Sequence, residues 1–174
     1  MIKSFNGKTP QIPDSAYISQ TATIIGDVQL GENVSIWPGA VIRADFGKIT
    51  IGNNSAIEDN CVIHTGSPGT FFCDVDIGKD VHIGHGAVLN CRSIGNNVLI
   101  GMNATILHES EIGSRCIIAA SCLVSQGMKI PDNSFVTGIP AKIKGDVSPK
   151  QFMWIERAPQ EYAKLAQKYK EERL

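Results

Sequence analysis

Aliphatic residues recur at every sixth position through most of this chain, and this repeat limits the folds that the chain can adopt. One series runs through Ile18, Ile24, Leu30, Ile36 and Ile42, a middle one includes Ile77, Ile83 and Leu89, and a later one runs from Ile94 to Val136. A column of mostly small residues, such as Ala22 and Ala104, lies four positions after the aliphatic ones. A period of six fits neither an amphipathic helix nor a half-exposed strand. It predicts short strands separated by turns, with three such units forming one coil of a triangular prism.

The repeat also predicts what lies inside the prism. We expect the aliphatic residues to fill the interior, the small residues to fit where the chain bends, and Gly and Asn to form the turns. At about 18 residues per coil the chain makes about six coils, and at about 4.8 Å per strand the prism is about 30 Å long. Residues 1–145 are therefore expected to form an all-β solenoid, a parallel β-helix.

Residues 146–174 are expected to form a helical tail. Ser148 has the character of an N-cap, Pro149 suits the first helical position, and Gln151 completes a capping box. Pro159 is expected to break or kink the helix. Beyond it, an apolar stripe with helical spacing is expected to pack along the prism or a neighbour: Tyr162, Leu165, Ala166 and Tyr169.

Two insertions interrupt the repeat. Three extra residues lie within Arg43–Lys48, and a longer insertion covers His64–Phe72. Insertions in a solenoid usually form loops on one side, which is commonly the binding side. We therefore expect both segments to be loops near the functional site.

Composition excludes several classes of function. The 174 residues include 16 Lys and Arg against 17 Asp and Glu, a net charge of -1, so a nucleic-acid partner is not expected. No apolar run approaches the roughly 20 residues that span a membrane. The N-terminal segment does not resemble a secretory signal, which predicts a cytoplasmic protein. The five cysteines show no C-x-x-C spacing, which argues against a disulfide scaffold or a structural zinc cluster.

Three histidines adjoin or follow the second insertion: His64, His82 and His85. A single histidine is usually an ordinary surface or core residue, but a cluster suggests chemistry. Neutral imidazoles are common zinc ligands, and a catalytic zinc takes three protein ligands and one open position. His64 and His85 are the better placed, which leaves such a site one ligand short.

Six segments of the chain form a recognisable set: Ser35–Trp37, Ala40–Asp45, Ile57–His64, Ile83–Leu89, Leu99–Met102 and Gly138–Lys142. They resemble the γ-class carbonic anhydrases, and the resemblance extends from about residue 8 to the C-terminal helix. Within this family the chain is most similar to the branch with proteins of phenylacetate and carnitine metabolism. The resemblance implies a left-handed β-helix and a homotrimer whose metal sites lie between adjacent subunits. The metal would be zinc, with iron or cobalt as alternatives.

The resemblance also implies which residues would hold the metal. His64 matches one ligand, and His85 matches the ligand that reaches across from the neighbouring subunit. The third ligand of the family is a histidine, but this chain has Asn90 there. An amide oxygen is a harder and weaker ligand than imidazole, so zinc affinity should fall. Replacement of the missing imidazole by Cys91 or His82 is left open.

Three other residues match family positions near the metal. Glu58 stands where the family usually has a glutamine that positions the hydroxide, and Arg43 and Asp45 match an Arg-x-Asp pair that resembles an intersubunit ion pair. The expected reaction is reversible hydration of carbon dioxide to bicarbonate, weakened or lost because of Asn90.

Two alternatives share these features. Acyltransferases with the same repeat resemble this chain in the prism, the trimer and the Gly-Ile-Pro-Ala-Lys ending; in them His64 or His85 would deprotonate an acceptor for attack on acyl-CoA. Hydrolysis of acyl-CoA is a related reaction. The other alternative is a trimeric scaffold without catalytic activity, as expected if the metal ligands have been lost.

Overall fold

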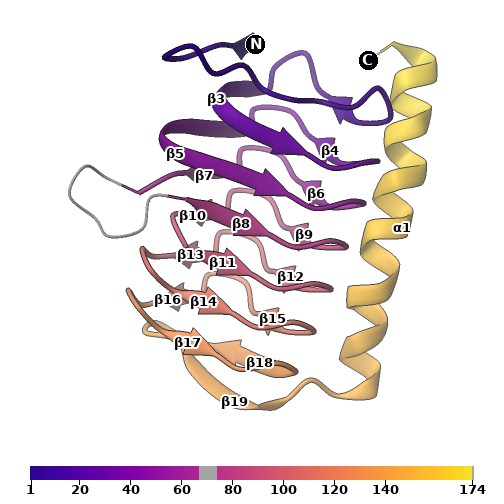
Figure 1. Cartoon of the computed structure of the whole chain (residues 1–174). Coiled ribbons are helices and arrows are strands. Elements are labelled where there is room, and N and C mark those ends of the chain that lie inside the picture. The colour runs from indigo at the N-terminus through magenta and orange to yellow at the C-terminus, as the bar shows by residue number, and fades with distance from the viewer. Residues whose placement is uncertain (67–73, 174) are drawn as a thin grey trace.

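A computed structural model of the chain describes residues 1–66 and 74–173. They form a triangular prism of stacked coils with one long helix beside it (Figure 1). This architecture confirms the predicted parallel β-solenoid with a C-terminal helix.

One face of the prism is a sheet of seven stacked parallel strands with an antiparallel strand at its end. The parallel strands are β2 (Tyr17–Ile18), β4 (Ser35–Ile36), β6 (Ala56–Ile57), β9 (His82–Ile83), β12 (Leu99–Ile100), β15 (Ile117–Ile118) and β18 (Ser134–Thr137), and the antiparallel one is β19 (Lys142–Asp146). Seven stacked strands imply about seven coils, one more than the repeat count suggested.

The other two faces belong to one sheet because the long strand β5 (Val41–Ile51) pairs with strands of both. On one side of β5 lie β7 (Val62–His64), β10 (Val88–Leu89), β13 (Thr105–Ile106) and β16 (Leu123–Val124). On the other lie β8 (Val75–Ile77), β11 (Ser93–Ile94), β14 (Glu111–Ile112) and β17 (Lys129–Ile130). The strands β1 (Ile2–Lys3) and β3 (Thr23–Leu30) complete this sheet before β5.

The interior consists of the aliphatic columns that the repeat predicted. The ladder of Ile36, Ile57, Ile83, Ile100 and Ile118 is fully buried, and small residues such as Ala22 and Ala104 are buried beside it. The coils are so close that glycine is required at some turns. A Cβ atom on Gly78 would lie 2.6 Å from the backbone oxygen of Gly95 in the next coil.

The first insertion differs from its prediction. Residues 43–48 do not form a separate loop but lie within β5, which pairs with β3 across an irregularity in register between Gly26 and Val28. Arg43 and Ala44 pair with β3, whereas residues 45–48 lie in this irregularity. There the backbone N–H groups of Phe46 and Lys48 donate to the side chains of Thr65 and Asp74. The second insertion extends beyond Gly66 into residues outside the described part of the chain.

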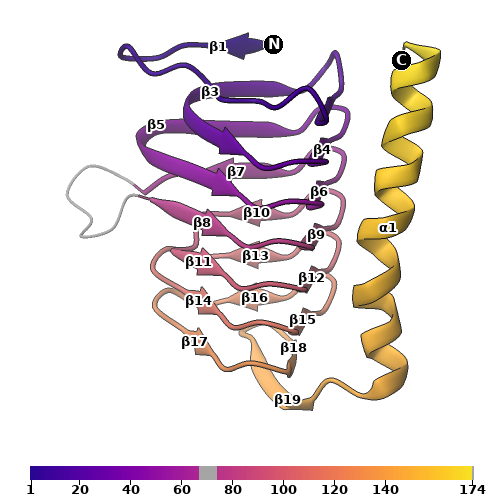
Figure 2. The ribbon, with the colours of Figure 1, turned by 45° about the vertical axis from the view of Figure 1, so that its right-hand side comes forward.

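The helix α1 (Pro149–Glu172) starts as predicted, with Ser148 as N-cap and a reciprocal capping box with Gln151. The predicted break at Pro159 is wrong, since the helix continues through this residue. The helix runs back along the prism from the last coil to the first (Figure 2). Most of the predicted stripe packs there, because Tyr162, Ala166 and Tyr169 contact Tyr17 and Trp37; Leu165 instead remains 39% exposed.

The helix is too polar to cross a membrane, and no other helix occurs in the described residues.

Candidate functional site

The first part of the candidate site is a column of residues at the ends of adjacent strands. Arg43 in β5 is in register with His64 in β7, and the register of β7 with β10 continues to Asn90, directly after β10. Neighbouring strands lie about 4.8 Å apart. The Asn90 side chain confirms this placement, because its Nδ2 donates to the backbone oxygen of His64 at 3.1 Å.

Asp45 holds the His64 ring. Its Oδ1 lies 2.8 Å from His64 Nε2, and its Oδ2 accepts a hydrogen bond from Arg43. Burial alone would raise the pKa of Asp45, but the hydrogen bonds from His64 and Arg43 outweigh it and lower that pKa. The carboxylate is therefore ionised at neutral pH. Arg43 and Asp45 form an ion pair within the chain.

The second part of the site is centred on Glu58, whose side chain is only 5% exposed. Its Oε1 lies 3.0 Å from His82 Nε2, and its Oε2 lies 3.1 Å from His85 Nε2. Oε2 also accepts from the backbone N–H of His85 at 2.8 Å, and the Tyr162 hydroxyl donates to the same carboxylate. Burial raises the pKa of Glu58, but these donors and the charge of His82 lower it further than burial raises it. Glu58 is thus a buried anion surrounded by donors.

His85 lies on an outer turn between β9 and β10, with its side chain 48% exposed. The turn contains Gly84 and Gly86, and Gly86 has a positive φ of 71° that a glycine adopts without strain. Besides its contact with Glu58, the ring places Nδ1 3.0 Å from Asp59 Oδ2. Both ring nitrogens of His85 therefore face carboxylates.

These two parts lie at opposite ends of β10, since His85 precedes the strand and Asn90 follows it. Consistent with this separation, residues 1–66 and 74–173 contain no group of three or more His, Cys, Asp or Glu side chains that could hold a metal ion within one chain. The predicted ligands can therefore meet only if two copies of the chain contribute to one site.

Two alternative ligands are placed elsewhere. Cys91 faces the core, where it is 1% exposed and burial raises the pKa of its thiol to about 12, so it offers no accessible thiolate. His82 is also buried, with Nε2 directed at Glu58. Neither replaces the missing imidazole beside His64 in this arrangement.

The structure adds two residues that the sequence analysis did not assign to the site. Asp59 follows Glu58 directly and lies in the turn that stacks on the His85 turn, where its backbone oxygen accepts a hydrogen bond from Gly86. Tyr162 was assigned only to packing, because a helical stripe gives no sign that one of its hydroxyls reaches a carboxylate on the prism. No local sequence signal links positions 58 and 162.

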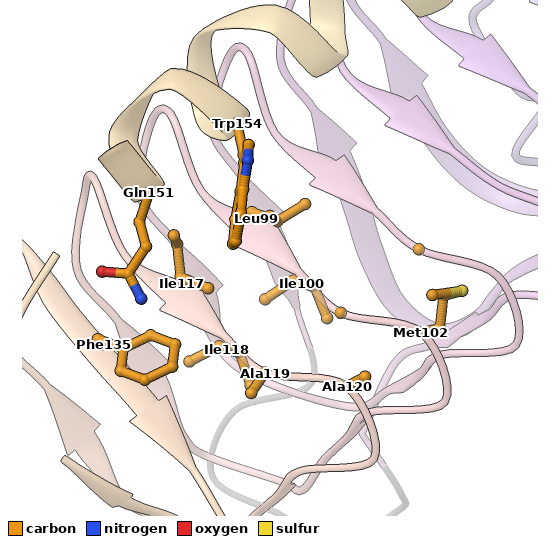
Figure 3. A pocket seen from close by; sticks show the side chains of 12 residues that line it. Leu99, Ile100, Met102, Ile117, Ile118, Ala119, Ala120, Phe135, Gln151 and Trp154 are labelled. Atoms are coloured by element: carbon orange, nitrogen blue, oxygen red, sulfur yellow. The ribbon is translucent and has the colours of Figure 1, made fainter. Parts of the chain in front are cut away.

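An apolar pocket of about 450 Å³ lies between α1 and the face formed by β12, β15 and β18. Figure 3 shows Trp154 and Gln151 of the helix on one side of it and Leu99, Ile117 and Phe135 on the other. Its lining extends to Gly84, the residue before His85. The pocket therefore adjoins the second part of the site but contains none of its charged groups.

Comparisons with known proteins agree with this fold. A family profile described as bacterial transferase hexapeptide (six repeats) matches residues 9–44 and 93–126. A carbonic anhydrase of Geobacillus kaustophilus is 41% identical over 98% of this chain and 91% of its own length. The carnitine operon protein CaiE of Escherichia coli is 34% identical over 93% of this chain and 81% of its own.

The solved structures include a putative acetyltransferase of Bacillus cereus, with a TM-score of 0.92 at 38% identity, covering 98% of this chain and 96% of that one. A hexapeptide transferase family protein of Anaplasma phagocytophilum has a TM-score of 0.90 at 32% identity, with 97% of each chain covered. The relatives thus carry names from both the carbonic anhydrase and the acyltransferase classes.

Proposed function

Because the chain belongs to the hexapeptide-repeat family that includes the γ-class carbonic anhydrases and CaiE, we propose that it hydrates carbon dioxide reversibly at a metal site shared between copies of a homotrimer. The observation that carries this proposal is the register that sets His64 and Asn90 side by side. His85, at the other end of β10, would complete the site of a neighbouring copy.

The donor atoms of these residues fit a divalent ion. Asp45 lies against His64 Nε2, which leaves Nδ1 for a metal, and a carboxylate behind a ligating imidazole is the usual arrangement around protein metals. Asn90 uses Nδ2 on backbone oxygens, and none of the described residues donates to its Oδ1. His85 would exchange one of its two carboxylate contacts for the metal.

This donor set binds zinc, iron or cobalt less tightly than three imidazoles, because one ligand is an amide oxygen. When bound, the ion supplies the Lewis acidity that makes water a nucleophile near neutral pH. The protein residues provide orientation. Asp45 fixes the His64 ring, and Glu58 fixes the turn that carries His85.

Glu58 differs chemically from the glutamine that it replaces. An ionised carboxylate only accepts hydrogen bonds, whereas a glutamine amide also donates them. Beside the proposed site, Glu58 would therefore accept a proton or a hydrogen bond from water during hydration.

Metal content and carbon dioxide hydration of three proteins test this proposal. They are the unmodified chain, Asn90→His, and Asn90→His combined with His64→Ala, all purified without chelator and supplied with zinc. We expect less than one metal per chain in the unmodified protein, about one in Asn90→His, and loss in the double variant. Loss of a residue that only supports a metal ligand lowers metal affinity or activity about 10–100-fold. Because Asn90→His restores a direct ligand, its rate of hydration should exceed that of the unmodified protein at least about tenfold. Metal-free Asn90→His, or a metal-loaded form without hydration, would refute the proposal.

A second candidate is acyl-CoA chemistry, which the pocket of about 450 Å³ beside Gly84 favours. An acyl chain in this apolar pocket would end near His85, whose Nδ1 lies 3.0 Å from Asp59, as in a general base held by a carboxylate. To act as a base, His85 would have to release Glu58 from Nε2. Calorimetry with CoA and a medium-chain acyl-CoA in the presence of chelator tests this candidate. Binding that Trp154→Ala weakens supports it, and no heat of binding to either compound removes it.

A further inference from the structure

We infer that His82 and Tyr162 are positioning residues that fix the buried Glu58 carboxylate, and through it His85. The catalytic consequence of this inference rests on the proposed function, but the positioning itself concerns contacts within one chain. It makes the C-terminal helix a component of the site rather than only a cover for the prism.

The two carboxylate oxygens of Glu58 contact different histidines. Oε1 faces His82 Nε2 at 3.0 Å, deep in the interface between prism and helix. Oε2 faces outward to His85, where it receives the backbone N–H at 2.8 Å and lies 3.1 Å from the ring. Because a carboxylate is planar, fixing one oxygen fixes the direction of the other. The inner contact therefore determines how the outer oxygen meets His85.

Glu58 is the hydrogen-bond partner of the His82 ring. Its side chain is 92% buried, and its second ring nitrogen, Nδ1, has no hydrogen-bond partner among the residues that the structure describes. A buried polar atom without a partner is costly, so the ring is retained at a cost to stability. Glu58 is the group that this ring serves.

Tyr162 closes the arrangement from α1. Its hydroxyl donates to Glu58, and its ring packs edge-on against His82 with centroids 4.7 Å apart. The ring of Tyr162 also packs edge-on against Trp37, with ring centroids 5.4 Å apart. Burial and the Glu58 carboxylate raise the pKa of Tyr162, so the hydroxyl keeps its proton and remains a donor. One residue thus holds both the carboxylate and the imidazole.

The test compares Tyr162→Phe with Tyr169→Phe. Tyr169 lies on the same helix and packs against Tyr17 and Trp37, so its loss controls for a missing tyrosine hydroxyl in the same aromatic cluster. The first readout is the set of nitrogen chemical shifts of the His82 and His85 rings in metal-free protein. We expect Tyr162→Phe to move both sets and Tyr169→Phe to leave them unchanged.

The second readout is hydration by the metal-loaded Asn90→His protein. Tyr162→Phe removes the hydrogen bond from the Tyr162 hydroxyl to the charged Glu58 carboxylate. In the Asn90→His protein it should therefore lower kcat about tenfold or more, whereas Tyr169→Phe should leave kcat unchanged. His82→Gln, which keeps an N–H donor, should retain more activity than His82→Leu. The inference is wrong if Tyr162→Phe leaves the His85 signals in place, or if Tyr169→Phe moves them equally. If the signals move but no hydration is found in any protein, the positioning stands and the proposed function fails.

Discussion

The close stacking of the coils predicts that alanine at Gly78 destabilises the prism although its backbone angles are ordinary. A Cβ atom there would lie 2.6 Å from the oxygen and 2.7 Å from the carbon of Gly95, both in backbone that cannot rotate away. To remove this overlap, two coils must separate beside the hydrogen bond from Gly78 N to Ile94 O, now 2.8 Å long. Overpacking costs about 1–3 kcal/mol. Weakening this hydrogen bond increases the loss of stability by about 0.5–1.5 kcal/mol. Alanine also makes the unfolded chain less flexible than glycine does, which stabilises the folded state by about 0.4–1 kcal/mol. The middle of these ranges gives an expected net loss of about 2 kcal/mol.

Gly127→Ala is the matched control. Gly127 has a positive φ of 66°, but no atom lies within 4 Å of an added Cβ. Its left-handed backbone costs an alanine about 1–2 kcal/mol, and the unfolded-state gain of about 0.4–1 kcal/mol offsets part of this. Urea unfolding at one fixed protein concentration measures both variants against the unmodified chain. If Gly78→Ala is as stable as Gly127→Ala, then contact between coils is not what requires glycine at position 78.

Three further predictions concern the core, the buried carboxylate and the cysteines. Ile83→Ala should lower the free energy of unfolding by about 2–5 kcal/mol in urea titrations, because this side chain is fully buried; a loss below about 1 kcal/mol would contradict this. Folding lowers the pKa of Glu58, so the ionised carboxylate stabilises the folded state. This stabilisation is fully present above the ordinary glutamate pKa of about 4.3, and it is lost as the pH falls through the lower pKa that Glu58 has in the folded protein. Thermal unfolding between pH 3 and 7 should therefore show a shallower acid dependence for Glu58→Gln, and parallel profiles would exclude this role. Burial raises the pKa of Cys61 and Cys91 to about 12. In a Cys73→Ser variant, neither thiol should therefore react with a thiol reagent at pH 8 until the protein is unfolded. Rapid labelling of these two thiols in the native protein would contradict their burial.

Most of the fold could be predicted because the residues within each six-residue unit determine the conformation of that unit. A residue such as Ile83 is inward because of its place in a six-residue unit, and each unit adopts the same conformation as its neighbours. The prediction failed where a longer contact decides the conformation. Of residues 43–48, Arg43 and Ala44 pair with β3 and the others lie in an irregularity within β5 rather than in a separate loop. Pro159 is buried in a helix that the prism supports along its length.

The candidate site also has one contact that follows from the repeat and one that depends on tertiary packing. The adjacency of His64 and Asn90 follows from strand register, which sequence spacing within a repeat encodes. The contact of Tyr162 with Glu58 depends on how a helix is placed on the prism, and that placement is set by packing around Trp37 and Tyr17 rather than by any local motif. Whether His85 meets a second copy is a question of assembly, which a repeat pattern in one chain does not encode.

The path of α1 has a consequence for how the molecule unfolds. In a solenoid each coil touches only its neighbours, so the terminal coils would ordinarily fray independently of each other. Here the 24-residue helix starts beside the last coil and extends about 36 Å. At its far end Lys170 Nζ donates to the backbone oxygen of Asp14 at 2.7 Å, beside the first coil. Opening either end therefore disturbs the same helix, and amide hydrogens in the first and last coils should exchange with solvent in one cooperative event.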